Sequence, residues 1–160
     1  MPKQRKKLLL VDGYNVLRSG SRYQRIAGPD YTDDTFNTAR EALINDVVNY
    51  AGRDWRAVIV FDGAKNRFST GEAETVGGVR IVFSPAGQSA DKVIEKLAHD
   101  ARERQVETLV VTSDATIQDT VFGNGVDRMS ADGFSHEVAL YYEDARLDET
   151  PKVAEKNTVA

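Results

Sequence analysis

Four aspartates are the residues of this chain whose type and spacing best suit chemistry. Asp12, Asp62 and Asp114 each follow a short apolar run, in KLLLVDGYN, AVIVFDG and TLVVTSD, and Asp91 opens SADKVIEKLA. In a parallel α/β sheet the carboxyl ends of the strands share one edge, and ligands bind in the crevice outside it. Carboxylates that meet there repel one another unless a cation lies between them. The pattern therefore predicts a hard-metal site at the sheet edge, of the kind that hydrolyses phosphodiesters.

A structural interpretation competes with this one. A single aspartate at the end of a strand is usually a turn or cap residue, and Asp62 with Gly63 fits a common turn. Structural use of all four, however, would leave an acidic cluster whose repulsion the fold must absorb. We therefore expect the four to form a functional cluster, and we keep the turn interpretation open for Asp62.

Glu95 is a further candidate because it lies four residues after Asp91. On a helix this spacing places both carboxylates on one face, where they repel each other. A cation between them would turn that repulsion into a pair of ligands. Alternatively, Glu95 faces water and pairs with Lys92 or His99, and the spacing alone leaves both positions open.

Alternating strands and helices must position these side chains. Runs rich in Leu, Val and Ile predict strands buried on both faces, over 7–12, 56–62, 79–84, 108–112 and 126–129. Apolar residues at helical spacing predict helices over 32–50, 89–101, 115–122 and 133–146. This order predicts an α/β fold, a three-layer α/β/α sandwich on a mostly parallel sheet.

Three segments lie outside this pattern. Residues 1–6 are basic and predict an N-terminal extension, and residues 63–78 are polar, contain glycines and predict a mobile loop beside the site. Residues 147–160 are polar, contain Pro151 and predict a disordered tail. We therefore expect one folded domain over residues 7–146.

The composition restricts the class of protein. With 160 residues, 41% of them hydrophobic, the chain can bury a substantial core. No apolar run approaches the ~20 residues of a membrane span, so we expect no membrane partner. The chain has no cysteine and only two, scattered, histidines, which excludes thiolate ligands and argues against a zinc site. A net charge of −4 argues against binding nucleic acid by bulk charge alone.

The turn after the first predicted strand excludes several phosphate chemistries. A phosphatase that forms an aspartyl-phosphate would need a second aspartate at position 14, which is Tyr14. Neither the dinucleotide-binding pattern G-x-G-x-x-G nor the P-loop pattern occurs. Gly13 suits a tight turn that lets a phosphate or an ion approach the backbone. Asn15 offers an uncharged donor and acceptor for orienting a ligand.

Four motifs together resemble one protein family. They are DGYN after the first strand, FDG after the second, SAD-x-x-IE at a helix start, and TSD-x-x-x-Q followed by G-x-G-x-x-R-M-S. In this order they are similar to the YacP-like NYN-domain proteins of the PIN-like nuclease superfamily, over residues 7–142. The resemblance implies a PIN-like fold, Mg²⁺ or Mn²⁺ as cofactor, and endoribonuclease activity. It also implies an association with translating ribosomes.

The resemblance ranks the candidate residues. The family's acidic site falls on Asp12, Asp91 and Asp114, with Asp62 as a further catalytic residue and Glu95 as a further metal ligand. The candidates for substrate binding are Asn15, Tyr14, Ser113, Lys65, Arg67 and Gln118. Tyr14 could stack on a base or pack over the sheet edge, and Lys65 and Arg67 could bind phosphates or be solvated.

We therefore expect a metal-dependent endoribonuclease that cleaves single-stranded RNA, with mRNA on the ribosome as the substrate that the resemblance implies. The alternatives are a catalytically idle module that binds RNA or the ribosome, and a metal-dependent phosphatase on the same fold. We expect a monomer in the cytoplasm, or in the plastid stroma for an organellar member.

Overall fold

The computed structural model describes residues 6–29, 32–63, 73–117 and 121–159. Along the chain its elements are β1 (Lys7–Asp12), α1 (Gly13–Ser19), α2 (Ser21–Ala27), α3 (Asp33–Ala51), β2 (Trp55–Phe61), β3 (Ala73–Val76), β4 (Val79–Phe83), α4 (Ala90–Glu103), β5 (Thr108–Val111), β6 (Val126–Met129) and α5 (Ala131–Val159). Three predicted substrate-binding residues, Lys65, Arg67 and Gln118, lie outside the described residues.

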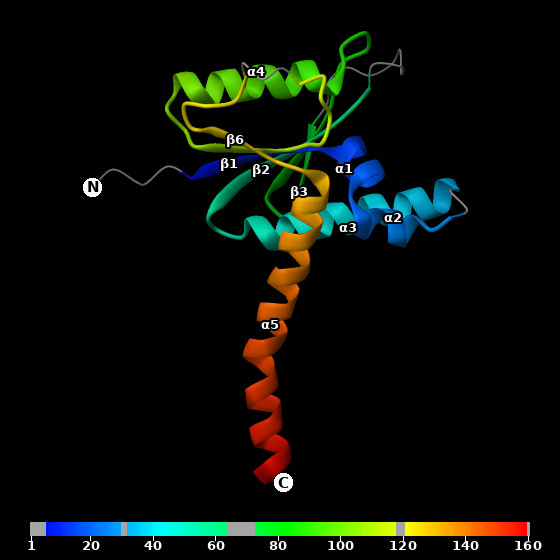
Figure 1. Ribbon diagram of the computed structural model, residues 1–160, viewed down its shortest axis with the longest axis vertical. Coiled ribbons are helices and arrows are strands. Elements are labelled where there is room, and N and C mark those ends of the chain that lie inside the picture. Colours follow the sequence, from blue (N-terminus) through cyan, green and yellow to red (C-terminus); the bar gives the residue numbers. More distant parts are fainter. Residues whose placement is uncertain (1–5, 30–31, 64–72, 118–120, 160) are drawn as a thin grey trace.

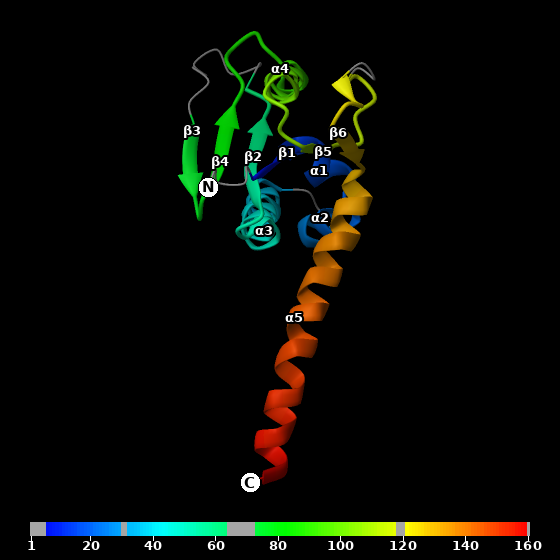
Figure 2. The same ribbon diagram turned by 90° about the vertical axis from the view of Figure 1, so that its left-hand side faces the viewer.

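The described strands form one sheet in the order β3-β4-β2-β1-β5-β6 (Figure 2). β3 runs antiparallel to β4, and the remaining pairs are parallel. From β1 the chain continues to β2 on one side and later to β5 on the other, so the strand order switches direction at β1. In such sheets the ligand crevice lies beyond the carboxyl ends of the strands at this switch.

Helices cover both faces of the sheet (Figure 1). In β1, Leu9 and Val11 face the core shared with α1, α2, α3 and α5, whereas Leu10 faces the core shared with α4. All three residues are fully buried, which explains why the strand reads as a continuous apolar run. The predicted α/β/α sandwich with a mostly parallel sheet is confirmed.

Local signals set the starts of two helices. Thr32 and Thr35 form a reciprocal capping box at the start of α3, which Asp33 and Asp34 follow in the first turn. Ser130 accepts a hydrogen bond from the amide of Gly133 and so caps α5 at Ala131, two residues earlier than predicted.

Four predictions about elements were incomplete or wrong. The helices α1 and α2 were not expected, because seven residues each are too few for a periodic pattern. Gly20 separates them, and a Cβ there would lie 2.6 Å from the carbonyl oxygen of Val16. The strand β3 was expected to be loop. The helix predicted over 115–122 is wrong for residues 115–117, which form a turn, and 118–120 lie outside the described residues.

The last helix differs from its prediction in length. α5 continues to Val159 and extends away from the sheet, whereas the helix was expected to end at Arg146 and a disordered tail to follow (Figure 1). Glu149, Lys152, Ala154, Glu155 and Lys156 in this part of the chain have high helix propensity. None of the described helices is long and apolar enough to cross a membrane.

Candidate functional site

Asp12 lies at the centre of the candidate site. It ends β1 and occupies the N-cap position of α1, and only 6% of it is exposed. α1 starts immediately afterwards at Gly13, which packs against Phe61 so closely that a Cβ would lie 2.4 Å from the ring. The Asp12 side chain makes no cap hydrogen bond to α1. Its carboxylate is therefore available to the edge of the sheet.

Thr112, directly after β5, connects two of the predicted acids. Its hydroxyl donates to Asp12 Oδ2 at 2.9 Å and accepts from the amide of Asp114 at 3.0 Å. Thr112 is fully buried, so this hydroxyl fixes both groups in one geometry. The sequence analysis missed Thr112. The sequence feature that could have indicated it is a threonine placed between the apolar run of β5 and the Ser113-Asp114 pair.

Asn15 and Ser113 join the end of β5 to its neighbours. Asn15 Oδ1 accepts from the Ser113 amide at 2.7 Å, and the Ser113 hydroxyl accepts from the Ala131 amide at 2.9 Å. Through these bonds α1, the loop after β5 and the start of α5 are held together. Both residues were predicted to bind substrate, and the structure shows them positioning the backbone that carries Asp114.

Asp114 is held by the turn in which it lies, and the residue after Asp62 is held by Ser84. Asp114 Oδ1 accepts from the amide and the hydroxyl of Thr116, at 2.9 and 2.8 Å. Asp62 is exposed after β2, and the next residue, Gly63, donates its amide to the hydroxyl of the buried Ser84 at 2.8 Å. The contacts of Asp114 are those expected of an aspartate that serves as a turn residue. Both bonds go to Oδ1, so Asp114 Oδ2 accepts no hydrogen bond from the described residues.

The four predicted aspartates converge. Burial raises the pKa of Asp12 to about 6, the hydrogen bond from Thr112 lowers it, and the charges of Asp114, Asp91 and Asp62 raise it further. Three carboxylates from distant parts of the chain are therefore close enough to act on Asp12. Among the described residues, no Lys, Arg or His forms an ion pair with Asp12, Asp91 or Asp114.

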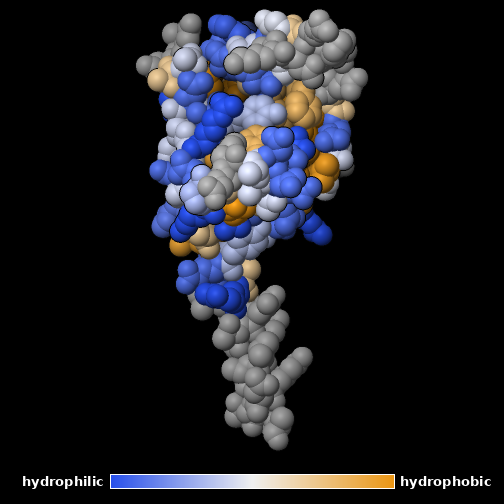
Figure 3. Space-filling view, turned by 90° about the vertical axis from the view of Figure 1, so that its right-hand side faces the viewer, coloured by the Kyte–Doolittle hydropathy of each residue, from blue (hydrophilic) through white to orange (hydrophobic). Residues whose placement is uncertain are grey.

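Figure 3 looks onto the side of the molecule on which β1 ends and α1 begins, and hydrophobic side chains are visible there between hydrophilic ones. Asp91 reaches this side from the first turn of α4. Glu95, one turn later, pairs with Lys92 at 3.6 Å, and its side chain is 18% exposed. The pairing with Lys92 that the sequence left open is therefore present.

The donor chemistry of this cluster suits a hard divalent cation. Carboxylate oxygens are the ligands that Mg²⁺ and Mn²⁺ prefer, and a cation would reverse the repulsion that raises the pKa of Asp12. The positions of the side chains suit it less well. Within the described part of the chain, no three Asp, Glu or His side chains lie close enough together to hold a metal ion. A coordination sphere would have to form by rotation of Asp12, Asp91 and Asp114 toward one another.

Tyr14 packs over the edge of the sheet. Its ring contacts Phe61 at a centroid distance of 4.9 Å and Phe36 at 5.5 Å, and the guanidinium of Arg18 lies 5.8 Å from it. Of the two interpretations given to Tyr14, packing over the edge accounts for these contacts. The aromatic cluster adjoins the acidic residues, because Phe61 directly precedes Asp62.

Comparison with known proteins gives consistent results. A family model described as the YacP-like NYN domain matches residues 9–159. The uncharacterized protein YacP of Bacillus subtilis (strain 168) is 32% identical over 131 residues, which span 82% of this chain and 74% of that protein. A crystal structure of a mutant of Rae1 (YacP) from Bacillus subtilis superposes with a TM-score of 0.73 at 29% identity, covering 93% of this chain and 85% of that one. For Rae1 (YacP) itself the TM-score is 0.70 at 28% identity, with 95% and 84% covered.

Proposed function

The chain belongs to the YacP-like NYN-domain family of the PIN-like nuclease superfamily, and we propose that it is a divalent-metal-dependent endoribonuclease acting on single-stranded RNA. One observation carries the proposal. Burial raises the pKa of Asp12 at the switch point of a parallel sheet, and three further aspartates from distant parts of the chain raise it more. Repulsion of this kind is relieved when a cation occupies the cluster.

In this proposal Asp12, Asp91 and Asp114 hold Mg²⁺ or Mn²⁺, and Asp62 and Glu95 complete the acidic surroundings. A bound divalent ion supplies an activated water and offsets the charge of the phosphate. The chain itself supplies the geometry. Thr112 holds the carboxylate of Asp12 and the backbone of Asp114, and Asn15 fixes the loop between them through the Ser113 amide.

The substrate and its delivery follow from charge. A chain with a net charge of −4 gains little from neutralising RNA phosphates, so it should bind free RNA weakly. We propose that a docking platform, the ribosome in the simplest case, raises the local concentration of RNA at the acidic edge. Cleavage of naked RNA should then be slow, and it should require millimolar Mg²⁺ or Mn²⁺.

Asparagine substitution tests the catalytic assignment. Asp12→Asn and Asp91→Asn keep the size of the side chain but remove the charge of a metal ligand. Each should lower the rate of Mg²⁺-dependent RNA cleavage by more than about a hundredfold. Losing a residue that only hydrogen-bonds to a metal ligand typically lowers activity by up to about a hundredfold. The matched control is Asp100→Asn, an exposed aspartate on the same helix as Asp91, which should cleave like the wild type. Wild-type cleavage by the double variant Asp12→Asn/Asp91→Asn would contradict the proposal.

A second candidate is a catalytically idle module that binds RNA or the ribosome. The positions of the acidic side chains favour this candidate over the nuclease. Within the described part of the chain they are not arranged as a ready metal site. A thermal melt with and without Mn²⁺ separates the two, because a ligand that binds the native state raises Tm by mass action. A nuclease should gain several degrees at millimolar Mn²⁺, whereas an idle module should show no shift.

A further inference from the structure

A pocket of about 660 Å³ lies between α3 and the strands β2, β4 and β3. β4 and β3 extend the sheet beyond α3 (Figure 2). On this face Ile81 is buried, while Val76 at the outer strand is 42% exposed. The volume is in the range of pockets that bind small molecules and nucleotides.

Two aromatic rings line the pocket at the carboxyl ends of β2 and β4. Phe61 and Phe83 line it, and their rings stack at a centroid distance of 5.5 Å and an interplanar angle of 26°. Phe61 directly precedes Asp62, and Phe83 directly precedes Ser84, the residue that holds the Gly63 amide. The pocket lining thus includes the last residues of the two strands that Asp62 and Ser84 follow.

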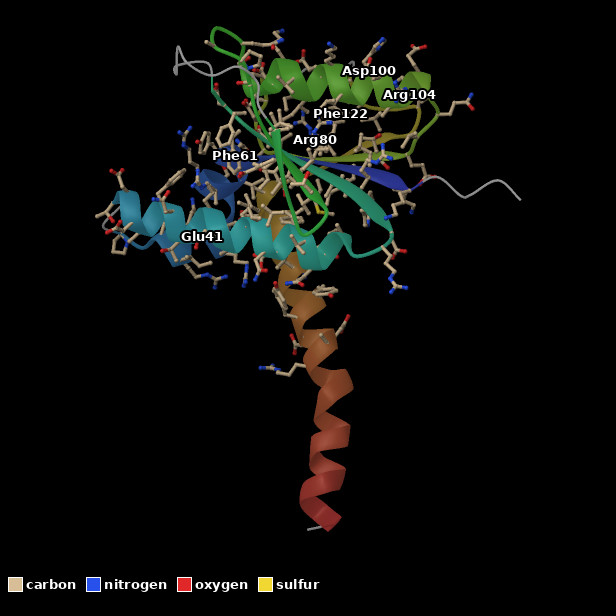
Figure 4. The ribbon with its side chains drawn as sticks, turned by 180° about the vertical axis from the view of Figure 1, so that it is seen from behind. Glu41, Phe61, Arg80, Asp100, Arg104 and Phe122 are labelled. Carbon is tan, nitrogen blue, oxygen red and sulfur yellow. The ribbon has the colours of Figure 1, made fainter. Side chains whose placement is uncertain are left out.

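Arg40 gives the pocket an unused donor. It lies on α3 in the lining, and its Nε is buried without a hydrogen-bond partner among the described residues. Buried donors are nearly always satisfied, so an unpaired one points to an acceptor supplied from outside. Two carboxylates, Glu41 and Glu74, line the same pocket, and neither forms an ion pair with Arg40 within the described part of the chain. Figure 4 shows Glu41 on α3, with Phe61 at the neighbouring end of the sheet.

These features restrict the ligand. Phe61 is fully buried, so the half-buried Phe83 is the ring that offers a ligand a flat, apolar face. Arg40 offers a donor beside that face, and the two glutamates favour amino groups and repel phosphates. Nucleobases combine a flat face with carbonyl and amino groups. A peptide segment would need no flat slot.

We propose that this pocket binds one nucleobase of the single-stranded RNA substrate, beside the phosphate held at the acidic cluster. The inference rests on the proposed function and adds to it a determinant of sequence preference. Arg40 donates to a base carbonyl, and Glu41 or Glu74 accepts from an exocyclic amine. Cytosine and guanine carry both groups, whereas adenine lacks the carbonyl and uracil lacks the amine, so the pocket should prefer cytosine or guanine.

The test is a binding measurement on the full-length chain carrying Asp12→Asn, which keeps the RNA intact. Fluorescence anisotropy gives Kd for single-stranded homopolymers of each base, about eight nucleotides long. The variants are Arg40→Gln, which removes the donor, and Ala42→Phe, which fills the pocket. The matched control is Arg80→Gln, which removes the same charge from β4 (Figure 4). Arg80 alternates with the inward Val79 and Ile81 and faces the other side of the sheet.

The proposal expects Arg40→Gln to weaken the preferred homopolymer about tenfold and to even out the preference among bases. The dependence of binding on salt should stay as it was, because a base contact releases no counterions. Ala42→Phe should weaken binding to a similar degree, and Arg80→Gln should change it by less than about twofold.

Three results would overturn the base pocket. Equal weakening of all homopolymers by Arg40→Gln, with a salt slope reduced by about one, would identify a phosphate contact. No effect of Arg40→Gln would show that its donor is not used. RNA binding by Ala42→Phe as tight as that of the parent chain would show that the pocket binds no base, and that its ligand is of another class, such as a peptide.

Cleavage by the wild-type chain is measured separately, so the pocket can fail while the nuclease assignment stands. Conversely, base preference that Arg40→Gln abolishes, in a chain whose wild type cuts no RNA, would support the pocket and contradict the nuclease.

Discussion

Asp46 on α3 and Asp12 at the end of β1 are both buried aspartates, with 2% and 6% of the residue exposed. Asp46 receives hydrogen bonds from Arg22 Nε at 2.8 Å and Nη2 at 3.3 Å, and from the hydroxyls of Tyr23 and Tyr142, each at 2.8 Å. Asp12 receives one hydroxyl, from Thr112, and three further carboxylates surround it.

The two sites differ in whether the chain itself compensates the buried charge. Around Asp46 the compensation is complete: the hydrogen bond to Asp46 raises the pKa of Arg22, and burial raises that of Tyr23, so that the cation stays charged and the phenol stays protonated. This network joins α2, α3 and α5. Around Asp12 the surroundings add repulsion. Burial therefore does not distinguish a structural carboxylate from a functional one, but the sign of the neighbouring charges does.

The largest expected effect comes from breaking the compensated site. Asp46→Ala would leave Arg22 and two tyrosine hydroxyls without their acceptor. It should lower the free energy of unfolding by about 3–4 kcal/mol. This is the low end of the range for breaking a buried ion pair, because the Arg22 side chain is 31% exposed. Urea unfolding measures this, with Asn37→Ala on the exposed face of α3 as control. A loss below about 1 kcal/mol would mean that the network is not structural.

The uncompensated site should make the stability of the fold depend on pH. The pKa of Asp12 rises from 3.8 to about 6 on folding, so between these pH values the folded state keeps a proton that the unfolded state has lost. The stability contributed by this proton is complete below pH 3.8 and is lost as pH rises through about 6, a loss of up to about 3 kcal/mol.

The measurement is urea unfolding across this pH range in the presence of a chelator. The wild type should lose stability relative to Asp12→Asn as pH rises, because asparagine does not titrate. Parallel curves for the two chains would show that Asp12 is compensated after all.

The smallest effect concerns the single donor to Asp12. Thr112→Val keeps the shape of the side chain but removes the hydroxyl, which should raise the pKa of Asp12 further and destabilise the fold by about 1 kcal/mol. Thr108→Val is the matched control on the same strand, since Thr108 is also buried but donates to the Val106 carbonyl at the opposite end. Both variants should lose stability, and only Thr112→Val should change the titration of Asp12.

The same contrast explains what the sequence could predict. Asp12, Asp62 and Asp114 end buried strands, and parallel pairing brings such ends to one edge whatever the details of packing. The fold class and the convergence of the acids were therefore predictable. Glu95 was ambiguous because its partner, Lys92, lies on the same helix and competes with the site.

The Asp46 network was not predictable, because its partners are contributed by packing. Arg22 lies 24 residues before Asp46 and Tyr142 lies 96 residues after it, with no motif connecting them. Arg22 also lies on α2, a helix too short to be recognised from periodicity. The pocket beside Phe61 depends on β3, which was expected to be loop, and this is why Arg40 drew no attention in the sequence.

The central claim, that the repulsion around Asp12 is relieved by a divalent cation, is tested most directly by anomalous diffraction from crystals grown with millimolar Mn²⁺. The account predicts a manganese peak bound to Asp12 together with Asp91 or Asp114, which Asp12→Asn crystals lack. Wild-type crystals without manganese at Asp12, or Asp12→Asn crystals with an unchanged peak, would contradict it.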